Sequence, residues 1–217
     1  MDEEVTRIKL LDHDLELLPE HAALWLETET LLVADLHLGK AQTFQIFGLP
    51  VPSGAEIRDL ERLAGVVKKT GAKRVMILGD LLHSRVGLRE PLVAAIALSL
   101  QNLGAEVSLV SGNHDSALER VAKIAGLPIH ASLEELGVWL IHKPLEAGPF
   151  IAGHVHPSAT LRLEGDLIKL PCFVLEGDGL TLPAFSSFAA GANMPRRAGR
   201  QRFVIADSQV IAVDERS

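Results

Sequence analysis

Short apolar runs alternate with segments of helical periodicity through the first half of the chain. Three runs have the length of buried strands: Leu31–Asp35, Val75–Gly79 and Val107–Val110. Three segments place apolar residues at helical spacing: Gly54–Lys69, Pro91–Leu103 and Ser116–Ala125. Strands and helices in this alternation predict βαβ units with parallel strands.

The starts of two of these helices carry side chains of the kind that cap a helix. Ser53 with Glu56, and Ser116 with Glu119, have the spacing of a capping box. A glycine follows the end of each helix, where a left-handed residue commonly stops it. The segment Leu38–Ser53 shows no clear period and is expected to be a long loop, of the kind that is often functional.

The second half of the chain reads as short strands separated by turns. The predicted strands are Val138–His142, Phe150–His154, Ala159–Leu163, Leu167–Leu170, Phe203–Ala206 and Val210–Val213. Glu164–Asp166 and Asp207–Ser208 are predicted hairpin turns. Since no repeat or linker interrupts the pattern, we expect one α/β domain over residues 1–217 with a mixed sheet core.

Composition and charge narrow the class of protein. The chain has 217 residues, 47% of them hydrophobic, and a formal net charge of −7, which excludes a disordered chain and disfavours a general polyanion binder. A single cysteine excludes a disulfide framework and a thiolate zinc cluster. The acidic N-terminus has no signal-peptide core, and the longest apolar run falls short of the ~20 residues that span a bilayer. We therefore expect a cytoplasmic protein with no membrane partner.

Polar residues gather at the carboxyl ends of the predicted strands, where α/β sheets bind ligands. These residues are Asp35, His37, Asp80, Asn113, His142, His154 and His156. Four imidazoles, two carboxylates and an amide exceed the three or four ligands of a single zinc ion, so they suggest two metal ions that share a carboxylate. The nitrogen and oxygen mixture suits manganese, iron or zinc better than calcium or magnesium.

The same residues form five ordered motifs: Asp35-Leu36-His37, Gly79-Asp80, Gly112-Asn113-His114-Asp115, His142 and Gly153-His154-Val155-His156. In these motifs the sequence resembles the calcineurin-like metallophosphoesterase superfamily. The resemblance implies a four-layer α/β/β/α sandwich of two mixed sheets flanked by helices. It also implies that Asp35, His37 and His156 hold one metal, that Asn113, His142 and His154 hold the other, that Asp80 bridges them, and that His114 is the general acid.

Flanking residues resemble a narrower group, the ligase-associated DNA damage response phosphoesterases. The similarity lies in residues 34–40, Phe44, residues 48–50, Pro52, Leu182–Phe185, Phe188 and Gly191. It implies a manganese-dependent phosphodiesterase or DNA endonuclease that associates with a DNA ligase and repair proteins.

The mechanistic hypothesis is that a metal-bridging hydroxide attacks phosphorus while His114 protonates the leaving oxygen, because an imidazole titrates near neutral pH. His83 stands where the Ser/Thr protein phosphatases of the superfamily have an Asp that orients the catalytic His, which argues against protein phosphatase activity and leaves open what orients His114. Lys40, His83 and Arg85 are candidate substrate-binding residues, with packing as the alternative for His83.

Other polar and aromatic residues have structural and functional interpretations. Four arginines in an acidic chain, Arg196, Arg197, Arg200 and Arg202, suit either a solvated loop or contacts to DNA phosphates. Phe44 and Phe47 are expected to pack rather than to stack on a base. His13, His21 and His130 are expected to be structural or solvated, and Cys172, Trp25 and Trp139 are expected in the core.

Two other function classes compete with a DNA phosphodiesterase. A small-molecule phosphatase or cyclic-nucleotide phosphodiesterase would use the same metal centre. A non-catalytic scaffold with this fold would have lost ligands, whereas all seven positions are filled here.

Overall fold

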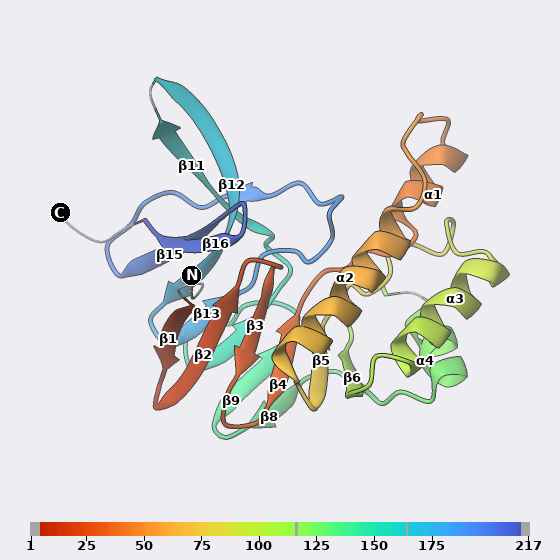
Figure 1. The fold of residues 1–217 in the computed structure, drawn as a ribbon, viewed down its shortest axis with the longest axis horizontal. Helices are drawn as coiled ribbons and strands as arrows, with labels where there is room; N and C mark the ends of the chain where they lie inside the picture. Colours follow the sequence, from red (N-terminus) through yellow and green to blue (C-terminus); the bar gives the residue numbers. More distant parts are fainter. Residues whose placement is uncertain (1–4, 116, 164, 214–217) are drawn as a thin grey trace.

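The computed structural model describes residues 5–213 except Ser116 and Glu164. Within this part the chain forms two mixed β-sheets and four helices (Figure 1). The predicted mixed α/β fold class with two mixed sheets is therefore confirmed, but the second helical layer of the expected α/β/β/α sandwich is not seen in the described part, where no helix covers the outer face of the second sheet. None of the helices in the described part has the length and apolar character needed to cross a bilayer.

The first sheet contains seven strands that neighbour one another in chain order. They are β1 Thr6–Leu10, β2 His13–Leu18, β3 Ala22–Trp25, β4 Thr30–Val33, β5 Arg74–Leu78, β6 Glu106–Val110 and β7 Ile129–His130. Strands β1 to β4 pair antiparallel, and β4 to β7 pair parallel, as βαβ units require. Strands β4, β5 and β6 are predicted from the sequence, whereas β1, β2 and β3 are not.

Three of the four helices cover the outer face of this sheet (Figure 1). The helices are α1 Lys40–Ile46, α2 Ala55–Thr70, α3 Glu90–Gln101 and α4 Leu118–Ala125. Leu63 of α2, Ile96 of α3 and Val121 of α4 are fully buried in one cluster with the sheet. Their burial explains why the helical period of these segments is visible in the sequence.

Two expectations about the helices are wrong, and a third concerns a residue outside the described part. Helix α2 begins after Gly54, and Ser53 instead accepts a hydrogen bond from Gln45 Nε2 at 2.9 Å. The segment expected to be a loop contains α1, a helix of seven residues, which is too short to show a period. The predicted cap Ser116 is not among the described residues, and α4 has Ala117 at its N-cap without a side-chain cap bond.

The second sheet contains nine strands and includes every strand after β7. They are β8 Leu133–Glu135, β9 Val138–Ile141, β10 Phe150–Ala152, β11 Pro157–Leu163, β12 Asp166–Glu176, β13 Gly179–Thr181, β14 Ala192–Asn193, β15 Arg200–Ala206 and β16 Gln209–Ala212. Strand β10 lies parallel between β9 and β13. The hairpin β11–β12 projects from the body of the molecule (Figure 1), and Glu164 of its predicted turn is not described. The predicted turn at Asp207–Ser208 joins β15 to β16.

A second core lies between the two sheets, besides the one between the first sheet and the helices. Trp25, Leu140 and Phe173 are fully buried there. Cys172 is also buried, on the opposite face of β12, so both Trp25 and Cys172 are where the sequence predicts. The prediction for Trp139 is wrong, because this residue is 39% exposed on the outer face of the second sheet, which no helix in the described part covers.

Candidate metal centre

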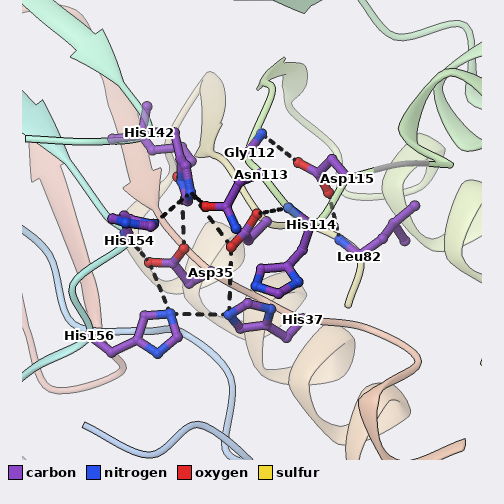
Figure 2. Close-up of polar contacts among 12 residues, drawn as sticks. Asp35, His37, Leu82, Gly112, Asn113, His114, Asp115, His142, His154 and His156 are labelled. Carbon is purple, nitrogen blue, oxygen red and sulfur yellow. Dashed lines mark hydrogen bonds and ion pairs between the residues drawn. The ribbon is translucent and has the colours of Figure 1, made fainter. Parts of the chain in front are cut away.

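The polar residues predicted from the sequence come together where strands of both sheets end. Asp35 follows β4, Asp80 follows β5, and His142 directly follows β9. Asn113 follows β6, and His154 follows β10. Figure 2 shows the side chains of Asp35 and Asn113 from the first sheet and of His142 and His154 from the second sheet pointing into one site.

Backbone hydrogen bonds hold the loops of the site to one another. The amide of Asp35 donates to the Gly79 carbonyl at 3.2 Å, and the amide of His37 donates to the Asp80 carbonyl at 2.8 Å. The amide of His154 donates to Asp35 Oδ2 at 2.7 Å, and so it joins the second sheet to the first. The relative positions of the ligands are therefore fixed by the fold.

Asp35, His37 and His156 form the first candidate metal site. Nε2 of His37 lies 3.1 Å from Nε2 of His156, and that nitrogen lies 3.6 Å from Asp35 Oδ2. Burial, with a smaller contribution from His156, lowers the pKa of His37 to about 2. The imidazole is therefore neutral at pH 7, which is the form that binds a metal.

Asp80, His142 and His154 form the second candidate metal site. His142 Nε2 lies 3.1 Å from Nδ1 of His154 and 2.9 Å from Oδ1 of Asn113. Burial, followed by His142, lowers the pKa of His154. Two imidazoles, a carboxylate and an amide oxygen thus converge on one point.

Asp80 lies between the two sites. Its Oδ2 is 3.6 Å from Nε2 of His142 and 4.0 Å from Nε2 of His37. Its Oδ1 accepts a hydrogen bond from the amide of His114 at 2.8 Å, which fixes the carboxylate. This position suits a carboxylate shared by two ions.

The donor set fits divalent cations. Asp35 is fully buried, yet its Oδ1 has no hydrogen-bond partner. Its neighbour His142 Nδ1, 3.7 Å away, already faces the Leu78 carbonyl at 3.4 Å. A buried carboxylate oxygen without a partner is costly, and close pairs of imidazole nitrogens compete for a proton, so a bound cation would relieve both.

Five of the seven predicted ligands have left-handed backbone conformations. They are Asp35 (φ 56°), His37 (φ 48°), Asp80 (φ 45°), His154 (φ 68°) and His156 (φ 48°). This conformation costs an ordinary residue roughly 1–2 kcal/mol, and strain of this kind gathers at functional sites. Strained turns after the strands thus aim the side chains into the site at the expense of stability.

Two glycines of the motifs give the ligands room. A Cβ at Gly79 would lie 2.0 Å from Nδ1 of His142, and a Cβ at Gly112 would lie 2.2 Å from Oδ1 of Asp80. Any side chain at either position would displace a ligand. The sequence motifs therefore contain these glycines for a steric reason.

The Asp115 carboxylate joins the loop that carries His114, the predicted acid, to the loop after β5. Its carboxylate accepts hydrogen bonds from the amides of Leu82 at 2.9 Å and Gly112 at 2.8 Å. Burial raises the pKa of Asp115 to about 6, against these hydrogen bonds, which lower it. These hydrogen bonds fix the turn from which Asn113 and His114 project (Figure 2).

His83 packs against His114, the predicted acid. Their rings stack at 5.5 Å between centroids with an angle of 17°, and His114 is also 5.5 Å from the ring of His37. Burial, followed by Lys40 and His114, lowers the pKa of His83. The His83 ring thus holds the side chain of His114 by stacking.

An aromatic pair continues from His83 to the edge of the site. Phe44 lies 5.9 Å from the His83 ring and 5.7 Å from the Phe188 ring, so its predicted packing is confirmed. Lys40 Nζ lies 5.7 Å from the Phe188 ring, and burial lowers the pKa of this lysine. The prediction for Phe47 is wrong, because it is 69% exposed beyond the end of α1.

The other residues singled out in the sequence lie apart from the two triads. Arg85 is exposed on the loop after β5. His21 Nδ1 lies 2.8 Å from the Ala184 carbonyl, and His13 Nε2 lies 3.0 Å from the Leu136 carbonyl, which are structural contacts. His130 ends β7 on the surface side of the sheet and joins neither triad.

The four arginines do not form one cationic patch. Arg200 donates through Nη2 to Glu176 at 2.8 Å, and Arg202 is buried with Nη1 2.9 Å from the Met194 carbonyl. Arg197 Nε lies 3.3 Å from Glu176 but remains exposed, as does Arg196. Two of the four arginines, Arg200 and Arg202, therefore make contacts within the fold.

One supporting contact was not predicted from the sequence. The buried Asp59 of α2 accepts a hydrogen bond from the amide of Ser187 at 3.0 Å and pairs with Arg62 at 3.1 Å. Arg62 donates to the Phe185 carbonyl and lies 4.2 Å from the Phe185 ring. The amide of Phe185 in turn bonds the Ala34 carbonyl at 2.7 Å, so α2 clamps this segment beside the ligands. No sequence signal marks the contact, because its partners are more than 120 residues apart.

Comparisons with known proteins agree with this geometry. The family model described as calcineurin-like phosphoesterase matches residues 29–173. The chain is similar to the crystal structure of a Pseudomonas putida nuclease, MPE, with 28% identity and a TM-score of 0.77 over 97% of this chain and 100% of that chain. A protein of unknown function from Aquifex aeolicus has 21% identity and a TM-score of 0.42 over 58% of this chain and 78% of that chain. No curated protein sequence matches the chain.

Proposed function

Because the chain belongs to the calcineurin-like phosphoesterase family, we propose that it hydrolyses phosphodiester bonds with two divalent metal ions, and that DNA is its substrate. The observation that carries the proposal is the pair of Asp/His triads joined at Asp80. The similarity to a nuclease over nearly the whole of both chains supports a nucleic-acid substrate.

The proposed ligands divide between two sites, and the two triads support this division. Asp35, His37 and His156 would hold one ion, Asn113, His142 and His154 would hold the other, and Asp80 would be shared by both. When bound, two such ions neutralise the phosphate and activate water for attack on phosphorus. Manganese is the metal that we propose, and iron or zinc would satisfy the same ligands.

His114 is the proposed general acid. It is exposed toward the open side of the site, while its amide is fixed by Asp80 and its ring by the stack on His83. It donates its proton to the oxygen of the leaving alcohol, a group that leaves poorly as an alkoxide. Such help is typically worth about 10²–10⁴ in rate.

The remaining parts of the proposal concern substrate contacts and cellular context. Lys40, His83 and Arg85 bind substrate in this proposal; the His83 ring lies 5.6 Å from that of the ligand His37, and Arg85 lies at the surface. The protein acts in the cytoplasm with a DNA ligase and repair proteins, as the resemblance of its flanking residues to ligase-associated phosphoesterases suggests.

Arg196 and Arg197 are the proposed contacts to DNA phosphates, because both are exposed, whereas Arg202 is buried and the Arg200 side chain is only 8% exposed. Replacing both exposed arginines by glutamine should reduce the salt dependence of DNA binding by about 0.7–0.9 in log–log slope for each phosphate that is no longer neutralised. An unchanged slope would remove them from the interface.

The direct test measures metal content and hydrolysis together. The purified protein should bind two metal ions for each chain and, with manganese, cleave plasmid DNA and bis(p-nitrophenyl) phosphate. Asp80→Ala should lose metal and activity, whereas His114→Ala should keep metal and turn over about 10²–10⁴ times more slowly. His130→Ala is the matched control outside both triads. Activity on phosphomonoesters alone would favour a small-molecule phosphatase instead.

A further inference from the structure

A cavity of 370 Å³ opens beside His156 and extends away from the metal ligands. Its walls come from the start of β11, the middle of β12 and the segment 184–191. Small-molecule sites commonly measure about 300–1,000 Å³, so the cavity can hold a ligand fragment the size of a nucleoside. His156 is the only proposed metal ligand in its wall among the described residues.

The wall chemistry suits an uncharged ligand with polar edges. Pro157, Leu170 and Pro171 supply apolar surface, and the hydroxyl-bearing residues Ser158 and Ser186 supply polar groups. No carboxylate lines the cavity in the described part of the chain. The one cationic side chain in the wall is Lys169, which is exposed and donates to the Gly191 carbonyl. A sugar and a base combine apolar faces and hydrogen-bonding edges in the same way.

Ser158 is an independent sign of a ligand in this cavity. It is 3% exposed, and its Oγ has no hydrogen-bond partner. A buried hydroxyl without a partner costs roughly 1–3 kcal/mol, so a ligand that bonds to it would recover this cost.

The wall around Ser158 is held rigidly. The amide of Met194 donates to the Ser158 carbonyl at 2.7 Å, and the amide of Ala192 donates to the His156 carbonyl at 2.8 Å. Gly191 lies against the serine, since a Cβ there would come within 2.7 Å of Ser158 Cβ. The cavity is thus built into the strand pairing of β11 and β14.

We infer that this cavity binds the nucleoside that stays attached to the phosphate after cleavage. The inference rests on the proposed phosphodiesterase function. Figure 2 shows His156 and His114 on opposite sides of His37. The group that leaves takes its proton at His114, so the retained nucleoside extends past His156 into the cavity.

Two p-nitrophenyl esters with the same leaving group test the inference. The retained group is thymidine in p-nitrophenyl thymidine 5′-phosphate and methyl in methyl p-nitrophenyl phosphate. The manganese-loaded protein should prefer the thymidine ester in kcat/KM. Filling the cavity by Ala189→Phe should reduce this preference at least about tenfold, and Ser158→Ala, which removes one hydrogen bond, should reduce it about 3–10-fold. Ala131→Phe, on an exposed loop far from the cavity in the fold, is the matched control and should keep the preference.

A second measurement covers the chance that Ala189→Phe fails to fold. Saturation-transfer NMR should detect thymidine bound to the wild-type protein and to Ala131→Phe, with a weaker signal for Ser158→Ala. Equal kcat/KM for the two esters in the wild-type protein, or an unchanged preference in both cavity variants, would overturn the inference and leave the phosphodiesterase proposal standing. Hydrolysis of neither ester would overturn the proposed function and the inference together.

Discussion

Replacing Asp80 by asparagine should separate metal binding from folding. Asp80 is 2% exposed, and its Oδ1 accepts the His114 amide at 2.8 Å. Asparagine keeps the size of the side chain and can still accept this hydrogen bond. The variant Asp80→Asn therefore removes one buried charge from the oxygen that lies between His37 and His142 and changes little else.

The size of the effect follows from ligand linkage. An ion present at a thousand times its Kd stabilises the folded state by about 4 kcal/mol. For a protein of this length, 1 kcal/mol shifts Tm by about 2–4 °C, so each bound manganese ion should raise the Tm of the wild-type protein by about 8–16 °C, and two ions by about 16–32 °C. Because Asp80 contacts both candidate sites, Asp80→Asn should lose most of this rise. Without metal, the variant should melt at the wild-type temperature or above it, since a buried charge with no cation destabilises the fold.

Differential scanning calorimetry in EDTA and then in rising manganese measures both effects. Asp12→Asn makes the same chemical change on an exposed turn and should keep the full manganese response. A full response in Asp80→Asn would refute the shared-carboxylate assignment. A metal-free Asp80→Asn protein that melts far below the wild type would show that Asp80 serves the fold rather than a cation.

Three further substitutions test the surroundings of the centre. Asp59→Ala breaks the buried ion pair that holds the segment beside the ligands, and it should lower the free energy of unfolding in urea by about 3 kcal/mol. Glu61→Ala, on the exposed face of the same helix, should not lower it. Equal stabilities of the two variants would contradict this role of Asp59. His83→Ala should slow hydrolysis of alkyl esters more than of p-nitrophenyl esters, which need no acid. His83→Phe keeps a stacked ring and should restore the rate on alkyl esters; an equal loss on both esters would deny a positioning role. Gly79→Ala places a Cβ 2.0 Å from His142 Nδ1 and should reduce the bound metal from two ions to one by elemental analysis, and retention of both ions would count against this steric reason.

Local sequence patterns predict those helices and strands that bury a whole face. The strands β4, β5 and β6 and the helices α2, α3 and α4 follow predicted segments to within a few residues. Burial on one or both sides gives such segments a period that the sequence displays. Helix α1 and strands β1 and β2 carry no comparably clear signal, because short or half-exposed elements depend on neighbours that are distant in the chain. Strand β3 has the length and the burial of β4 and is nevertheless not predicted.

The sequence by itself determined which residues form the candidate centre, because each short motif follows a strand and the carboxyl ends of strands meet at one edge. Only the tertiary structure decided how these residues are grouped. The sorting into two triads depends on the second sheet facing the first, through contacts such as that of the His154 amide with Asp35 Oδ2 at 2.7 Å. The engagement of Arg200 and Arg202 within the fold likewise depends on the pairing of β15 with β12. Chain order determines which residues lie at the carboxyl edge of a sheet. The distances between their side chains are set only when strands far apart in the sequence pack together.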